Sequence, residues 1–255
     1  MNIRAKGTDR LLDVLDVMMQ QEKPITRNAI AAILGAPRTT IYSVIDTLLT
    51  RGYLDQIEPD GLIVPGRRCG LLGFAYDKST PLLREAKDVV KKLSEATGEL
   101  VELDVLQDWK QLILVSRSGR GHTYRGASEG TRMPLPWTAS ARFLLQNVAR
   151  DDLARFIPSE DFSTPSGQPT SLDILSHEIG LARETGFWIA RGLVDPYIGC
   201  VAAPVNNRQG HCIGVICLIL PLQELAKREE TLTEMTIQAA KALTASCTSL
   251  QNPSF

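Results

Sequence analysis

The first part of the chain alternates between helical and extended hydrophobic patterns. Leucine and methionine residues recur at three- and four-residue spacing over residues 8–21, which predicts an amphipathic helix. A short second helix is expected after Thr26, whose hydroxyl can cap its first turn, and a third helix over 38–51. Between them, Gly35-Ala36-Pro37 predicts a tight turn, because glycine frees the backbone and proline presets φ at a helix start.

Two short extended stretches follow the third helix. Residues 53–57 and 62–64 are joined by Glu58-Pro59-Asp60-Gly61, which is typical of the turn in a β-hairpin. Three helices followed by a hairpin form the pattern of a winged helix-turn-helix, in which the third helix enters the major groove of DNA. We therefore expect a DNA-binding domain over residues 1–65.

The rest of the chain predicts a linker and a second domain. An apolar stripe at Leu71, Leu72 and Phe74 predicts a helix over 66–78, which we interpret as part of a linker over 66–79. Residues 80–255 mix helices and strands without a repeating βαβ unit. The expected strands are 100–107, 110–117, 199–205 and 211–220, and the expected helices are 81–97, 138–148, 151–156, 171–185 and 231–248. This order predicts an α+β fold with a mainly antiparallel sheet flanked by helices.

Composition limits the function classes without choosing one. The net charge of −1 neither favours nor excludes a nucleic-acid partner, so the case for DNA rests on the pattern of elements. Five cysteines without a CxxC pair or zinc-finger spacing, and a polar first segment, lead us to expect a cytoplasmic protein with reduced thiols. No metal, cofactor or membrane partner is expected, because no matching motif or long apolar stretch is present.

The exposed face of the third helix carries the candidate DNA-binding residues. Arginine can pair with a guanine edge, threonine and serine offer hydroxyls, and tyrosine can bond a phosphate. Arg27 starts the second helix, where a contact with the DNA backbone is expected. The candidate set is Arg27, Arg38, Thr39, Thr40, Tyr42 and Ser43.

Several ordered motifs resemble one known family. They are NAIAAILGAPRTTIY at 28–42, LLTRGYL at 48–54, VPGR at 64–67, GTRMPLPWTASAR at 130–142, GCVAAPV at 199–205 and IGVICLILP at 213–221. In this order they resemble the IclR family of bacterial transcriptional regulators. The chain departs from the family at Ser43, where many members have arginine, and we expect an atypical operator as a result.

The resemblance implies that the second domain is a GAF-like effector-binding domain. Carried over residue by residue, the implied pocket residues are Met133, Ala139, Ser140, Asp195, Cys200, Cys217 and Ile219, with Trp137 and Trp188 as further wall candidates. Cys217 and Ile219 stand where members that bind small acids often have serine. We therefore expect an effector with an apolar or aromatic body and an acid or amide head. A carboxylate should prefer the start of helix 138–148, where Thr138 can act as the cap, and an amide should prefer Asp195.

The sequence favours a transcriptional regulator over an enzyme. We expect a ligand-responsive protein that binds a pseudo-palindromic operator as a dimer or tetramer and represses or activates transcription. The alternative is a small-molecule-binding protein or an enzyme whose winged helix is a protein-interaction module. The segment Gly126–Gly130 fits G-x-S-x-G, but a nucleophilic Ser128 needs a helix directly after it, and the prolines at 134 and 136 disfavour one.

Overall fold

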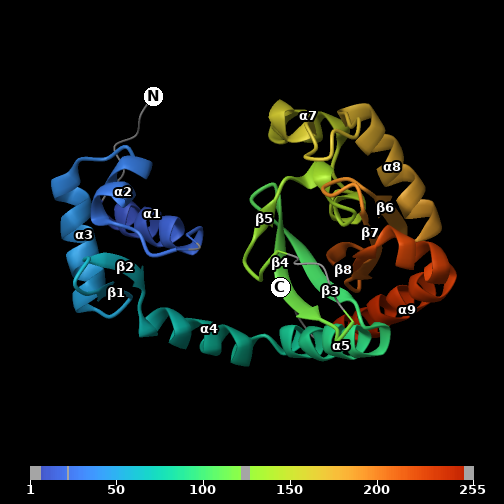
Figure 1. Cartoon of the computed structure of the whole chain (residues 1–255), viewed down its shortest axis with the longest axis horizontal. Coiled ribbons are helices and arrows are strands. Elements are labelled where there is room, and N and C mark those ends of the chain that lie inside the picture. Colours follow the sequence, from blue (N-terminus) through green and yellow to red (C-terminus); the bar gives the residue numbers. More distant parts are fainter. Residues whose placement is uncertain (1–6, 22, 122–126, 250–255) are drawn as a thin grey trace. The chain divides into compact units, whose positions relative to one another are not determined.

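The computed structural model describes residues 7–21, 23–121 and 127–249. The chain divides into two compact units, Met1–Ser79 and Thr80–Phe255 (Figure 1).

The first unit consists of three helices, a hairpin and a fourth helix. The elements are α1 (Gly7–Met19), α2 (Arg27–Ile33), α3 (Arg38–Thr50), β1 (Leu54–Ile57), β2 (Leu62–Pro65) and α4 (Arg67–Ser79). The side chain of Thr26 accepts a hydrogen bond from the amide of Ala29 at 3.2 Å, as expected for the cap of α2. Gly35 has φ of 55°, which explains why glycine follows α2 at the turn before α3.

One small core holds the three helices and the hairpin together. Ile30, Ile41, Ile45, Leu54 and Ile63 are all inaccessible to solvent, so α2, α3 and both strands share their apolar faces. The strands pair antiparallel, and Ile63 also forms an isolated bridge with Ile25, which precedes α2. The hairpin is thereby fixed against the helices, as in a winged helix-turn-helix.

The second unit is built on a six-stranded antiparallel sheet with the order β5-β4-β3-β8-β7-β6. The strands are β3 (Leu100–Gln107), β4 (Lys110–Ser118), β5 (Arg132–Met133), β6 (Trp188–Arg191), β7 (Ile198–Asn206) and β8 (Cys212–Pro221). The central strands β3 and β8 are hydrogen-bonded on both sides, so neither is an edge strand.

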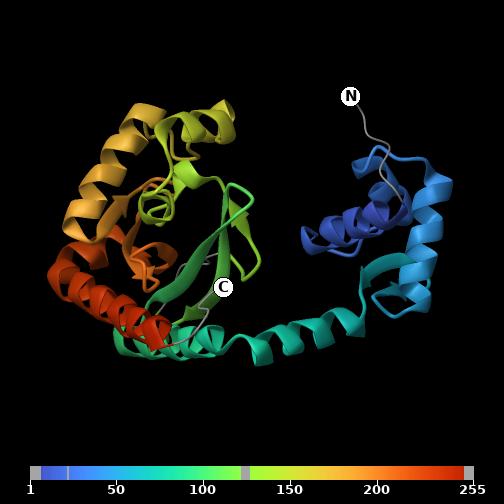
Figure 2. The same cartoon turned by 180° about the vertical axis from the view of Figure 1, so that it is seen from behind.

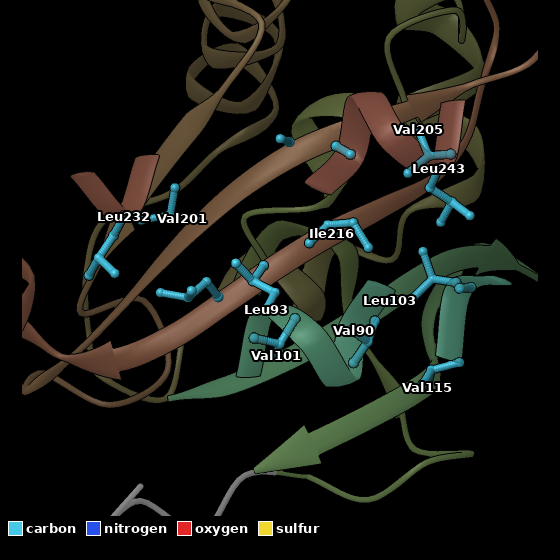
Figure 3. Packing of buried hydrophobic residues seen from close by; sticks show 14 of the residues in the cluster. Val90, Leu93, Val101, Leu103, Val115, Val201, Val205, Ile216, Leu232 and Leu243 are labelled. Carbon is cyan, nitrogen blue, oxygen red and sulfur yellow. The ribbon is translucent and has the colours of Figure 1, made fainter. Parts of the chain in front are cut away.

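Helices cover both faces of this sheet. On one face, α5 (Pro81–Thr97) and α9 (Leu222–Ser249) pack side by side, as Figure 2 shows. Val90 and Leu93 from α5 meet Val101 and Leu103 from β3 in the core of that face (Figure 3). The opposite face is covered by five shorter elements, which are η1 (Leu135–Trp137), α6 (Ala141–Leu144), α7 (Arg150–Phe156), η2 (Ser159–Phe162) and α8 (Leu172–Thr185). The α+β class with a flanked antiparallel sheet is therefore confirmed.

Three local expectations need correction. The helix expected over 138–148 is reduced to the four residues of α6, all of which are buried, so the segment has no exposed face to support a longer amphipathic helix. The last helix begins at Leu222 and not at 231, with a kink at Arg228. The strands β5 and β6 were not expected, because stretches of two and four residues are too short for a periodic pattern.

Candidate functional site

The second unit contains a cavity of about 250 Å³ on the sheet face opposite α5 and α9. A water molecule needs roughly 10–15 Å³ on such a measure, so the cavity has room for a small organic molecule. Its walls come from β3, β4, β7 and β8, from the segment around η1 and α6, and from the turn between β6 and β7.

The residues that the resemblance implied for a pocket all line this one cavity. Their positions span β5, the segment before α6, the turn after β6, and strands β7 and β8. They are Met133, Ala139, Ser140, Asp195, Cys200, Cys217 and Ile219. Trp137 also lines the cavity, whereas Trp188 is half-buried on β6 and packs into the apolar core of the same sheet face. The structure thus brings the predicted set together, and its role in effector binding stays a prediction.

Three buried polar residues of the cavity wall were missed by the sequence analysis. Glu102 and Asp104 lie two residues apart on β3, so both side chains lie on the same face of the sheet, and Gln111 follows on β4. All three are buried, and only 1% of Asp104 is exposed. Ser140 donates a hydrogen bond to Oε1 of Gln111 at 2.7 Å, which ties the segment before α6 to the sheet.

The two carboxyl groups are strongly affected by burial. Desolvation raises the pKa of Asp104 from 3.8 to about 7, although the neighbouring polar side chains of Cys217, Ser140 and Gln111 lower it. Burial raises the pKa of Glu102 well above its usual range, and the nearby Asp104 raises it further. The hydrogen bond with Cys200 and burial likewise raise the pKa of the Cys217 thiol. Near neutral pH, Cys217 is therefore a thiol and Asp104 lies close to its midpoint of ionisation.

The structure differs from the sequence prediction at Thr138 and at the start of the predicted helix 138–148, and it shows a further contact of Asp195. Thr138 does not cap a helix, because its hydroxyl donates to the carbonyl of Leu135 at 3.1 Å. With only four residues, α6 is also too short to offer the anion site expected at the start of helix 138–148. Asp195 accepts a hydrogen bond from the amide of Tyr197 at 2.8 Å, so one of its oxygens already stabilises the turn before β7.

A buried arginine holds the cavity wall in place. Arg142 on α6 is 1% exposed and donates to the carboxylate of Glu178 on α8. It also donates to the carbonyls of Pro136 and Thr138, which belong to the segment lining the cavity. Arg142 therefore fixes that segment to α8, without itself being one of the lining residues of the described chain.

The candidate DNA-binding residues divide into two groups. Arg38, Thr39, Thr40 and Ser43 are exposed on α3. Arg27 and Tyr42 are instead engaged within the domain. Arg27 donates to Asp46 at 2.6 Å and to Gln56 at 3.0 Å, and Tyr42 donates to Asn28 at 2.9 Å. Arg27 thus joins α2 to α3 and to β1, and it can reach DNA only if it leaves these partners.

The enzyme alternative gains no geometric support around Ser128. The described residues after it lead through a turn into β5 and not into a helix, which a nucleophile elbow requires. Gly126, the first residue of that motif, lies outside the described residues. Within the described ranges, no three His, Cys, Asp or Glu side chains gather as a metal site would require. No helix there is both long and apolar enough to cross a membrane.

Comparisons with known proteins cover both units. The protein-family model described as "IclR helix-turn-helix domain" matches residues 7–58. The family model described as "Bacterial transcriptional regulator IclR C-terminal" matches residues 74–245. The HTH-type transcriptional regulator XynR of Escherichia coli is 23% identical over 244 residues, covering 93% of this chain and 97% of XynR. The transcriptional repressor IclR of the same organism is 20% identical over 247 residues, covering 94% of this chain and 89% of the repressor.

Solved structures show the same fold. An IclR transcriptional regulator from Alicyclobacillus acidocaldarius has a TM-score of 0.82 at 19% identity, covering 95% of this chain and 99% of that one. An IclR homologue from Microbacterium hydrocarbonoxydans, solved in complex with 4-hydroxybenzoate, has a TM-score of 0.80 at 21% identity, with coverage of 95% and 99%.

Proposed function

Because the chain belongs to the IclR family of bacterial transcriptional regulators, we propose that an effector in its cavity changes its affinity for a DNA operator. The observation that carries this proposal is the cavity of about 250 Å³, which is lined by all seven residues implied by the resemblance. A ligand can shift DNA binding only by the difference between its affinities for two states of the protein. In this proposal the protein works in the cytoplasm, where it binds DNA. Its role is regulation and not catalysis.

DNA recognition is assigned to the exposed start of α3. Arg38, Thr39, Thr40 and Ser43 can approach base edges and phosphates there. Ser43 cannot supply the bidentate guanine contact of an arginine, so Arg38 is the arginine of this surface best placed to read a guanine. Arg27 and Tyr42 are proposed to act on DNA through the orientation of α2 and α3, which their hydrogen bonds stabilise.

A pseudo-palindromic operator requires two copies of the chain. One winged helix contacts too few base pairs for specificity in a genome. The helix α4 has no buried residue in the described chain, and Leu71, Leu72 and Phe74 on it are 62%, 58% and 74% exposed. A second copy would cover these apolar side chains in a dimer or tetramer, as apolar surface of this extent is usually covered.

The apolar lining of the cavity supports an effector with an apolar or aromatic body. Met133, Trp137 and Ile219 supply apolar walls. The homologue from M. hydrocarbonoxydans was solved with 4-hydroxybenzoate, a molecule with an aromatic body. An acid or an amide is the head group that we expected from the sequence, and the buried carboxyl groups of the cavity bear on the choice between them.

The proposal is tested by selecting operators from genomic DNA with the purified full-length chain. Retained fragments are sequenced, and their affinity is measured across salt concentrations, since phosphate contacts make binding fall as salt rises. We expect a shared inverted repeat that wild type retains and Arg38→Ala does not. Lys241→Ala, a change on α9 of the second unit, serves as the matched control and should retain the same fragments. A chain that retains no fragment selectively would instead favour a protein-interaction role for the winged helix.

A further inference from the structure

The described part of the cavity wall carries acidic groups without basic ones. Among its described lining residues are the carboxyl groups of Glu102, Asp104 and Asp195, and no lysine, arginine or histidine. The buried cation Arg142 is engaged with Glu178 and with two carbonyls, and does not line the cavity. Once ionised, these carboxyl groups would repel an anionic ligand, whereas a cation would be attracted to the two that lie on one strand.

One atom of this wall lacks a hydrogen-bond partner. Oδ1 of Asp104 is buried and has none among the described residues, although buried polar atoms in folded proteins nearly always have one. The hydroxyl of Ser140 does not supply it, because that hydroxyl donates to Gln111. An unpaired buried acceptor is unfavourable, and a donor on a ligand in the cavity would satisfy it.

We propose that the effector carries a protonated primary amine, which donates hydrogen bonds to Asp104 Oδ1 and to Glu102 while its apolar body packs against Trp137, Ile113 and Ile219. This inference rests on the proposed function, since it concerns the ligand of the same cavity. An ammonium group offers three donors and one positive charge, which matches two neighbouring carboxyl groups. A hydroxyl offers one donor and no charge, an amide offers two donors and no charge, and a carboxylate offers neither.

Binding of an ammonium group should release a proton from the cavity. Asp104 faces Glu102 on its own strand, Gln111 on β4, Ser140 before α6 and Cys217 on β8. Burial raises the pKa of Asp104 to about 7, and none of these described neighbours carries a positive charge. The bound ammonium favours the ionised form, and the affinity for an amine should therefore increase between pH 6 and pH 8.

Three probes of nearly equal size test the choice of head group. Benzylamine, benzamide and benzoate share one ring and differ in charge and donors. Binding to the full-length chain is measured by calorimetry at pH 6 and pH 8, in two buffers of different ionisation enthalpy that report proton release. We expect benzylamine to bind at least about tenfold more tightly than benzoate at pH 8, with benzamide between them, because benzoate meets like charges.

Isosteric variants locate the effect. Asp104→Asn should weaken benzylamine binding about tenfold or more and reduce the proton release, and Glu102→Gln should change both quantities in the same direction. Asp108→Asn, on the same β-hairpin but outside the cavity, should leave binding unchanged. Thermal melting of each variant confirms that the second domain is folded.

The results that would refute an amine effector differ from those that would refute the proposed function. Benzoate binding as tightly as benzylamine, no binding of benzylamine, or full binding by Asp104→Asn would each overturn the amine proposal. Any of these leaves intact a regulator that responds to another ligand. The proposed function fails separately, when no compound that binds the cavity alters DNA affinity.

Discussion

Replacing Asp104 by asparagine should make the second domain less sensitive to pH. The folded-state pKa of Asp104 is about 7, against an ordinary value of 3.8. Since the folded-state pKa is raised, the folded state holds its proton where the unfolded chain has lost it. The contribution of Asp104 to the free energy of unfolding is therefore fully present below pH 4. This contribution is lost as the pH rises towards 7.

The size of the effect follows from the two pKa values. Each pH unit between them lowers the free energy of unfolding by about 1.4 kcal/mol, so the full loss above pH 7 is on the order of 4 kcal/mol. Asparagine is isosteric and does not ionise, so Asp104→Asn should avoid this loss. The difference in free energy of unfolding between the variant and wild type should therefore be about 2–3 kcal/mol more favourable to the variant at pH 8 than at pH 5. Glu102 remains in both proteins, and loss of the Asp104 charge lowers the raised pKa of Glu102, which acts in the same direction.

Urea unfolding followed by tryptophan fluorescence is a suitable assay. All three tryptophans, Trp109, Trp137 and Trp188, belong to the second unit, so the fluorescence reports this unit alone. Asp108→Asn is the control, because that side chain is 72% exposed and should show no comparable gain. A difference between Asp104→Asn and wild type that stays constant from pH 5 to pH 8 would show that Asp104 is not a desolvated acid.

Three further changes test other parts of the account. Arg38→Ala should weaken operator binding by about 1–3 kcal/mol and relax preference at one base pair if Arg38 pairs with a base, as footprinting on operator variants would reveal. Leu72→Glu should favour monomers and abolish operator binding, and sedimentation showing an intact dimer would refute this assignment of α4. Gly66→Ala should lower the melting temperature of the first unit, because an added Cβ would lie 2.6 Å from the carbonyl oxygen of Gly52, and calorimetry with Gly70→Ala as the control measures the effect.

The winged helix could be predicted nearly to the residue because its pattern is local. Thr26 caps α2, Gly35 forms the turn before α3, and the turn at 58–61 joins β1 to β2, each through its own backbone chemistry. In the second domain, long strands and helices were equally apparent. The region around α6 was not, because buried Arg142 bonds to backbone carbonyls there, and such tertiary contacts leave no periodicity in the sequence.

The acidic part of the cavity could not be predicted for a related reason. Glu102 and Asp104 alternate with Val101 and Leu103, a pattern that ordinarily indicates a strand with one face in water. Both faces of β3 are covered in the fold, so the polar face becomes a cavity wall. Only the packing of other elements on both faces of the sheet, which is a long-range feature, distinguishes these two cases.

The central claim is that a ligand in the cavity and DNA on α3 affect each other's affinity. The most direct measurement is a complete thermodynamic cycle on the full-length chain, with a selected operator and each amine, acid or amide that raises its melting temperature. The account predicts that the compound changes the Kd for the operator by some factor, and that the operator changes the Kd for the compound by the same factor, since linkage is reciprocal. An operator Kd that is unchanged at saturating concentrations of every bound compound would contradict it.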